Sequence, residues 1–339
     1  MIPFIPPAGL SSGVFQTILG SQMTGDTTIE DRRVHKIPLG GKNLLLCLEL
    51  PAKSEKQPLV VMIHGMGGCS ESAYMRRIAT RLGKRGLGVF MVNQRGSGPG
   101  MGLSNSLWNG GSSGDLACVV EYLTHVFPAR PVLLIGFSLS GNILLKYLGE
   151  GRAIPSTVHA ALSVNPPVDL KAAALAISSG RWSRTFNRYY MGLINRQVRA
   201  IRQCFPDAFV PQGEPSTIYD FDVAYTARVG GFRNVDDYYE KCSAAHLLDR
   251  IVVPTTVLCS RNDPFVPFDI FQSLKMSLCV VGEFPEGGGH MGYIANKKLP
   301  TGDRRWMDYF VCEWVADACR IEEGAPGGAA LASAEPGAK

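Results

Sequence analysis

The chain has 339 residues, of which 45% are apolar and 19% are charged, and its formal net charge is +5. Its mean hydropathy is close to zero, at +0.05. These values are typical of a globular protein, and no apolar stretch approaches the roughly 18 residues of a membrane-spanning helix. We expect no secretory leader, because the first basic residue is Arg32 and early prolines interrupt any apolar stretch.

The chain contains nine cysteines, an odd number, and no C-x-x-C pair. Most of them lie inside apolar stretches, as Cys47 does in a run of leucines. We interpret them as small buried side chains and not as disulfide partners or zinc ligands. A reducing compartment fits this use of cysteine, so the predicted location is cytoplasmic.

The first 57 residues are predicted to form an N-terminal segment and a β-hairpin. The segment to about residue 30 is rich in Pro, Gly, Ser and Thr, and we expect it to be irregular. Strand-like runs follow at residues 32–37 and 43–50, with Gly40 and Gly41 as the turn between them.

Strand and helix patterns alternate from residue 58 to residue 167. The predicted strands are residues 59–63, 89–92, 131–135 and 160–164, and the predicted helices are residues 70–84, 113–126 and 139–148. The strands are continuous apolar runs, which is typical of a mostly parallel sheet with helices on both faces. The fold class is therefore α/β.

Residues 168–245 interrupt this alternation, since they are mostly helical and aromatic. The alternation then resumes with a strand at 255–259, a helix at 267–276, a strand at 277–284 and a closing helix at 303–320. We predict a core made of residues 58–167 and 246–321, with residues 168–245 as a helical cap insertion over one edge of the sheet. Residues 322–339 are rich in Ala, Gly and Pro and are predicted to be a disordered tail.

Ser138 is the candidate nucleophile, in the segment 136–141 (Gly-Phe-Ser-Leu-Ser-Gly). Ser11 and Ser112 match the G-x-S-x-G pattern strictly, but neither directly follows an apolar strand. Ser138 lies between a predicted strand and a predicted helix, and a sharp turn there exposes a serine Oγ at the carboxyl edge of the sheet. The alternative is an ordinary strand–helix turn.

A serine is a weak nucleophile until a histidine accepts its proton and a carboxylate orients that histidine. In this type of sheet both partners follow the serine in the chain. His290 is the candidate base, because it follows the last predicted strand in a glycine-rich loop. Asp263 is the candidate acid, because it follows the strand at 255–259; its alternative role is an N-cap. Asp269 is a rival acid, but it falls inside the next predicted helix.

The strand at residues 59–63 leads into the loop His64-Gly65-Met66-Gly67-Gly68 at the same edge of the sheet. The backbone N–H groups of Met66 and Leu139 are predicted to hold the oxyanion of a tetrahedral intermediate. We interpret His64 as a brace for this loop and not as a catalytic group.

These motifs resemble those of the YheT-like branch of the α/β-hydrolase superfamily. The likeness extends from about residue 15 to Trp314 and includes the segments 64–68, 93–98, 136–141, 260–265 and 288–290. Two segments of the insertion, residues 219–222 and 231–239, also look like signatures of the family.

The resemblance implies an α/β-hydrolase fold and a serine hydrolase that cleaves carboxylic esters with short or medium acyl chains, or lipids. The catalytic residues of the family correspond to Ser138, Asp263 and His290, and no metal or organic cofactor is implied. Ser140 departs from the family, which usually has glycine there; the departure concerns only the packing of the turn.

Three functions stay open at this point. The first is hydrolysis of carboxylic esters through an acyl-enzyme at Ser138, and the second is transfer of the acyl group to an alcohol. The third is ligand binding without catalysis, since a fold does not determine a function. A complete Ser, Asp and His set in the expected order argues against the third.

The positive charge is concentrated in six arginines, namely Arg181, Arg184, Arg188, Arg196, Arg199 and Arg202. If residues 181–202 form one helix, these arginines lie within an arc of about 120°, with aromatic and aliphatic side chains, Tyr189 among them, on the opposite side. We hypothesise that the apolar side covers the acyl pocket and the basic side contacts an anionic membrane surface. The alternative is a solvated helix face. The expected partner is a small-molecule or lipid ester, not a nucleic acid, and the sequence does not indicate an oligomeric state.

Overall fold

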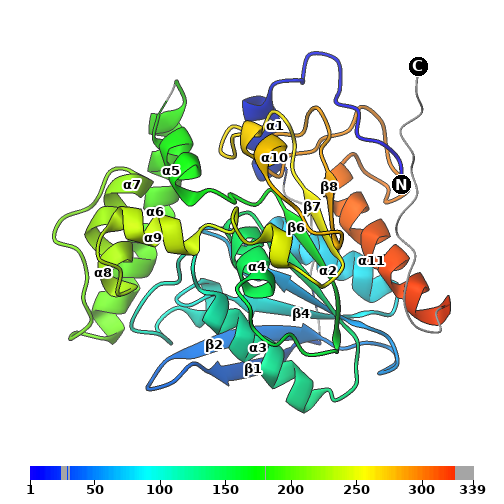
Figure 1. The fold of residues 1–339 in the computed structure, drawn as a ribbon, viewed down its shortest axis with the longest axis horizontal. Helices are drawn as coiled ribbons and strands as arrows, with labels where there is room; N and C mark the ends of the chain where they lie inside the picture. Colours follow the sequence, from blue (N-terminus) through cyan, green and yellow to red (C-terminus); the bar gives the residue numbers. More distant parts are fainter. Residues whose placement is uncertain (24–28, 30, 180, 325–339) are drawn as a thin grey trace.

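The computed structural model describes residues 1–23, 29, 31–179 and 181–324, with side chains up to residue 320. Within these residues, eight strands form one sheet in the order β1-β2-β4-β3-β5-β6-β7-β8 (Figure 1). The strands are β1 (Arg33–Pro38), β2 (Leu44–Leu50), β3 (Leu59–Ile63), β4 (Gly88–Asn93), β5 (Val132–Phe137), β6 (Val158–Val164), β7 (Thr255–Leu258) and β8 (Val280–Glu283).

The strands from β3 to β8 run parallel, whereas the hairpin of β1 and β2 joins β4 in antiparallel orientation. Neighbouring residues of β5 belong to two different core clusters: Val132 and Leu134 to one, Leu133 and Ile135 to the other. The continuous apolar run of the strand therefore reflects a sheet that is covered on both faces, as the sequence predicts.

Helices lie on both faces of the sheet (Figure 1). α3 (Ser113–Val126) and α4 (Leu139–Gly149) pack into the core on one face, and α2 (Ala73–Lys84) and α11 (Trp306–Gly324) into the core on the other. α10 (Asp269–Ser273) is shorter than its predicted range. In the described part of the chain, no helix combines the length and apolarity needed to cross a bilayer.

The C-terminal tail prediction begins too early, because α11 continues to Gly324. The sequence there contains Glu322 and Glu323, and Glu is a good helix former. The remainder of the predicted tail, residues 325–339, lies outside the described residues.

The insertion between β6 and β7 is helical and lies at one side of the sheet (Figure 1). Its elements are α5 (Leu170–Ser178), α6 (Ser183–Cys204), α7 (Ile218–Phe221), η2 (Asp222–Thr226), α8 (Ala227–Val229) and α9 (Val235–Cys242). Of the two short 3-10 turns, η1 (Gly98–Gly100) follows β4, and η3 (Leu248–Arg250) connects α9 to β7.

α6 is one unbroken helix, and all six arginines of residues 181–202 are exposed. Phe186, Ile194 and Ile201 are buried on its other side. Tyr189 is 58% exposed, so the prediction that it lies on the covered side is wrong. Its helical position borders the arginine arc, where a side chain can turn toward solvent.

The segment that was expected to be irregular contains a helix, α1 (Gly13–Gln22). This helix packs so closely on two loops that its glycines are required: a Cβ on Gly13 would lie 1.8 Å from the carbonyl oxygen of Asn262, and one on Gly20 would lie 2.6 Å from the Cα of Gly292. The composition favoured an irregular segment because local propensity is weak evidence when tertiary contacts stabilise a helix.

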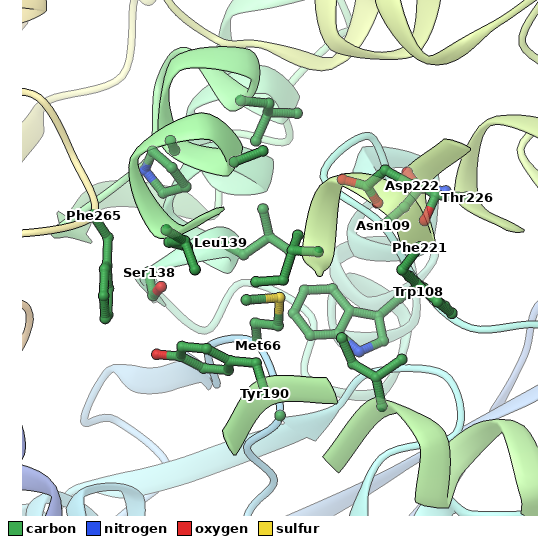
Figure 2. Close-up of a pocket in the computed structure, with 18 of the residues that line it drawn as sticks. Met66, Trp108, Asn109, Ser138, Leu139, Tyr190, Phe221, Asp222, Thr226 and Phe265 are labelled. Atoms are coloured by element: carbon green, nitrogen blue, oxygen red, sulfur yellow. The ribbon is translucent and has the colours of Figure 1, made fainter. Parts of the chain in front are cut away.

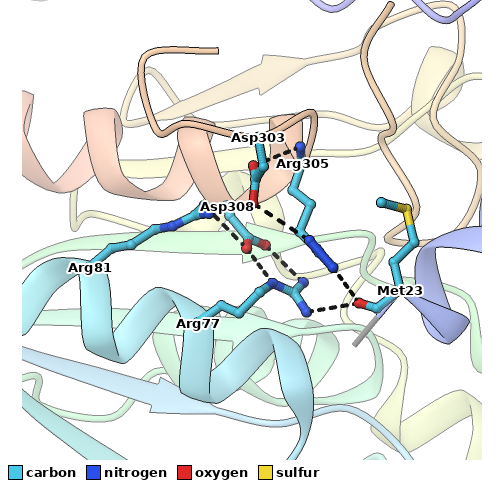
Figure 3. Close-up of polar contacts among 6 residues, drawn as sticks. All are labelled: Met23, Arg77, Arg81, Asp303, Arg305 and Asp308. Atoms are coloured by element: carbon cyan, nitrogen blue, oxygen red, sulfur yellow. Dashed lines mark hydrogen bonds and ion pairs between the residues drawn. The ribbon is translucent and has the colours of Figure 1, made fainter. Parts of the chain in front are cut away.

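Buried ion pairs hold the end of α1 (Figure 3). Nε of Arg77 on α2 lies 2.7 Å from Oδ2 of Asp308 on α11, and these residues are 7% and 0% exposed. Arg77 and Arg305 both donate to the carbonyl oxygen of Met23, which directly follows α1, at 3.3 and 2.6 Å. The cluster therefore connects α1 to the helices on one face of the sheet.

Candidate active site

Ser138 lies at the sharp junction between β5 and α4. Its backbone angles, φ 52° and ψ −123°, are unfavourable for a residue with a Cβ, and its N–H donates to the carbonyl oxygen of Val164 at 2.7 Å. Gly136 makes the junction possible, because a Cβ there would lie 2.4 Å from the carbonyl oxygen of Ser140. The turn places the Ser138 side chain at the carboxyl edge of the sheet.

Ser138, His290 and Asp263 form a chain of hydrogen bonds. Oγ of Ser138 lies 2.8 Å from Nε2 of His290, and Nδ1 of His290 lies 2.8 Å from Oδ2 of Asp263. His290 and Asp263 are 8% and 9% exposed, so these bonds are shielded from water. The structure therefore brings the three predicted residues together, whereas the rival Asp269 begins α10 and is outside this chain of bonds.

Three further donors hold the Asp263 carboxylate. The N–H groups of Phe265 and Val266 bond to Oδ1 at 2.8 and 3.1 Å, so Asp263 caps a short turn and not the helix α10. Nδ2 of Asn165 bonds to Oδ2 at 2.6 Å. The sequence prediction missed Asn165, although its place directly after β6, at the same carboxyl edge as Ser138, is a signal that could have found it.

α1 supports the loop that carries His290. Oγ1 of Thr17 accepts a hydrogen bond from the backbone N–H of His290 at 2.8 Å and donates to the carbonyl oxygen of Gly13 at 2.7 Å. A Cβ on Gly289 would lie 2.1 Å from that same carbonyl oxygen, so the glycine before His290 permits a close contact with α1. No local pattern in the sequence indicated this contact.

Met66 and Leu139, whose N–H groups are the predicted oxyanion donors, line the same pocket as Ser138 and His290.

The His64 ring instead bonds to the backbone of two loops. Its Nδ1 lies 2.8 Å from the carbonyl oxygen of Gly65, and its Nε2 accepts from the N–H of Gln94 at 3.1 Å. Burial lowers the pKa of His64 to about 4, so the ring is neutral at pH 7 and braces the two loops.

The hydroxyl of Ser140, at the position where the resemblance implies glycine, makes two hydrogen bonds. It donates to the carbonyl oxygen of His64 at 2.5 Å and accepts from Nε2 of Gln94 at 3.3 Å. Ser140 is completely buried. Its side chain therefore connects the turn of Ser138 to the loop of Met66.

Two cavities meet at Ser138. The first, called the apolar pocket below, lies between the core and the insertion, and Leu139, Trp108, Leu170 and Phe221 contribute to its wall (Figure 2). The second cavity lies on the side of α1 and α2, and its wall includes the polar groups of Ser72, Tyr74 and Arg77. Met66, Tyr190 and His290 line both cavities.

The buried face of α6 covers the site. Tyr190 and Ile194 line the apolar pocket, and Phe186 packs edge-to-face on Phe265 with ring centroids 4.6 Å apart. Phe265 in turn packs against the His290 ring, with centroids 4.8 Å apart. These contacts keep water away from the imidazole and connect the insertion to the candidate catalytic residues.

Comparison with known proteins gives matches to hydrolases. A protein called "Putative esterase YheT" from Escherichia coli (strain K12) is 29% identical over 323 residues, which is 92% of each chain. A "Monoacylglycerol lipase" of Saccharomyces cerevisiae is 27% identical and shares 77% of this chain and 59% of its own length. The "Medium-chain fatty acid ethyl ester synthase/esterase 2" of the same yeast is 28% identical, over 75% of this chain and 62% of its own.

The solved structure of the Pyrococcus furiosus esterase Pf2001 superposes with a TM-score of 0.55 at 14% identity, over 89% of this chain and 97% of its own. At that identity the likeness concerns the fold alone. A protein-family model described as "Alpha/beta hydrolase family" matches residues 60–299. This match covers most of the chain, and together with the sheet order and the likeness to YheT it confirms the predicted fold and resemblance: the chain belongs to the α/β-hydrolase family.

Proposed function

We propose that this protein hydrolyses carboxylic esters through an acyl-enzyme at Ser138. The observation that carries the proposal is the chain of hydrogen bonds from Ser138 through His290 to Asp263, at the wall of an apolar pocket. The names of the relatives, which describe esterases and lipases, support the same class of reaction.

In the first half of the reaction, Oγ of Ser138 attacks the ester carbonyl carbon while Nε2 of His290 accepts the hydroxyl proton. Asp263 holds the ring in the required orientation and stabilises the imidazolium. The N–H groups of Met66 and Leu139 donate to the oxyanion. The tetrahedral intermediate then collapses, His290 protonates the departing alcohol oxygen, and the acyl group stays on Ser138.

In the second half, His290 removes a proton from water, and the resulting hydroxide attacks the acyl carbon. His290 then returns the proton to Oγ, so that the carboxylic acid leaves and Ser138 is restored. We assign the acyl chain to the apolar pocket, because apolar side chains form most of its wall, and the alcohol to the second cavity with its polar groups.

Transfer of the acyl group to an alcohol is the second candidate, because one relative is named as both an ester synthase and an esterase. The acyl-enzyme is the same, and an alcohol replaces water in the second half. Product analysis with added ethanol separates the two: hydrolysis yields the free acid alone, and transfer yields an ethyl ester as well.

The proposal is tested with a fluorophosphonate probe and p-nitrophenyl esters of increasing chain length. We expect Ser138→Ala to abolish labelling and to lower kcat by at least about 1,000-fold, because the nucleophile is lost. Ser11→Ala is the matched control, since Ser11 is an exposed serine in a strict G-x-S-x-G segment. This variant should keep both the labelling and the kcat of the wild type. Labelling that persists in Ser138→Ala would refute the assignment.

A further inference from the structure

The apolar pocket contains a buried carboxylate that the proposed mechanism does not use. Asp222 lines the pocket and is 9% exposed. Figure 2 shows Asp222, Thr226 and Asn109 grouped on the side opposite Ser138, with Leu139 and Trp108 between the two sides. A carboxylate at the end of an apolar pocket is costly unless a partner satisfies it, so its position requires an explanation.

The neighbours of Asp222 satisfy it only in part. The hydroxyl of Tyr239 donates to Oδ2 at 2.9 Å, and the hydroxyl of Thr226 is a second donor. Among the described residues, no lysine or arginine forms an ion pair with Asp222, and burial raises its pKa to about 6. An ionised carboxylate accepts about four hydrogen bonds, so two protein donors leave capacity for a ligand.

The Asp222 carboxylate lies on an unusual turn of the backbone. Asp222 begins η2, a π-helical turn between α7 and α8. Such turns are rare in proteins, and those that occur often lie at functional sites. Asp222 and Tyr239 come from two separate segments of the insertion, η2 and α9. The hydrogen bond between them joins these segments at the far end of the pocket.

We propose that the far end of the apolar pocket is a polar subsite, and that the preferred substrate is an ester whose acyl chain carries a hydroxyl group at its distal end. The inference rests on the proposed ester hydrolysis. The methylene groups of the chain would lie along Leu139 and Trp108, and the terminal hydroxyl would donate to the Asp222 carboxylate. An unsubstituted chain of the same length would leave that carboxylate without its third donor.

The test compares kcat/KM for pairs of p-nitrophenyl esters, each pair made of an ω-hydroxyacyl ester and an unsubstituted acyl ester with the same number of heavy atoms. At about pH 8, where the carboxyl is ionised, we expect the hydroxylated ester to be preferred by about tenfold or more at the best chain length. Asp222→Asn keeps an acceptor for Tyr239 and should reduce this preference at least threefold. Asp222→Leu should reverse it.

Asp220→Asn is the matched control, because Asp220 lies two residues away but is exposed, and it should leave the preference unchanged. The inference is wrong if wild type cleaves both members of every pair equally, or if the Asp222 variants slow both esters by the same factor, as a merely structural carboxylate would. In those cases hydrolysis of the unsubstituted esters still supports the proposed function. Failure to cleave any ester would instead overturn the proposed function, and this inference with it.

Discussion

Several polar residues near Ser138 hold loops in place through buried hydrogen bonds. Ser140 bonds to the carbonyl oxygen of His64, and His64 bonds to Gly65 and to Gln94. The turn of the nucleophile and the loop of Met66 are thereby parts of one buried network. Since buried polar groups are costly when a partner is lost, this network makes the relative position of the two loops rigid.

A dependence of stability on pH follows from His64. Its pKa falls from 6.5 to about 4 on folding because the ring is buried. Between these values the unfolded chain binds a proton that the folded chain does not, so acidification lowers the free energy of unfolding, by up to about 3 kcal/mol. His64→Asn should be less stable than wild type at pH 7, and the difference should shrink toward pH 4.

Urea denaturation of both proteins at pH values across this interval checks the prediction. A stability difference between wild type and His64→Asn that stays constant from pH 7 to pH 4 would show that His64 does not titrate as described.

Among the elements, α1 has a role that its composition did not indicate. It contacts the His290 loop through Thr17 and through glycines that allow main chains to approach, and Arg77 and Arg305 hold its end. A helix from the first 23 residues therefore positions His290, which lies 273 residues after Thr17 in the chain.

Thr17→Val should lower kcat by about tenfold with little change in KM. Valine has nearly the shape of threonine but cannot accept the hydrogen bond from the His290 N–H, so a buried donor is left unsatisfied and the loop loosens. Steady-state kinetics measure the effect, and Thr17→Ser should restore most of the rate.

The matched control is Thr124→Val, because Thr124 on α3 also donates to the carbonyl oxygen four residues earlier, at 2.9 Å, but does not line either cavity. It should keep the wild-type kcat. If Thr17→Val also kept it, the contact between α1 and the His290 loop would not matter for the rate.

For the molecule as a whole, the distribution of charge limits how the protein can bind to a membrane. The six arginines of residues 181–202 are exposed, but the apolar face of α6 is packed against the core and the pocket. No apolar face of this helix is left to insert into lipid, so a contact between this helix and a membrane would be electrostatic.

We therefore expect the protein to co-sediment with anionic vesicles at low salt and to be released at about 0.15 M ionic strength, where charges are screened over about 8 Å. Exchanging Arg188 and Arg196 for Glu should abolish the binding, whereas Arg250→Glu, at an exposed site outside the insertion, should not. Binding that does not change with the salt concentration or with the anionic lipid content of the vesicles would contradict this expectation.

Some parts of the molecule could be predicted from the sequence and others could not, for a physical reason. β3 matches its predicted range completely, because a buried parallel strand is a local apolar run bounded by turn residues. Asn165 was missed because its role depends on the neighbouring strand β7, whose loop carries Asp263. Tyr189 was placed on the wrong side because periodicity gives a direction around the helix but not the extent of the surface that covers it.

The sequence by itself determined the α/β architecture and the order of Ser138, Asp263 and His290, because strand runs, turns and helix patterns are properties of short segments. Only the tertiary structure decided that α1 supports His290, that Asn165 joins Asp263, and that Asp222 and Tyr239 meet at the end of the apolar pocket. Each of these contacts joins segments that are separate in the chain, and their distance depends on how the sheet, the helices and the insertion pack together.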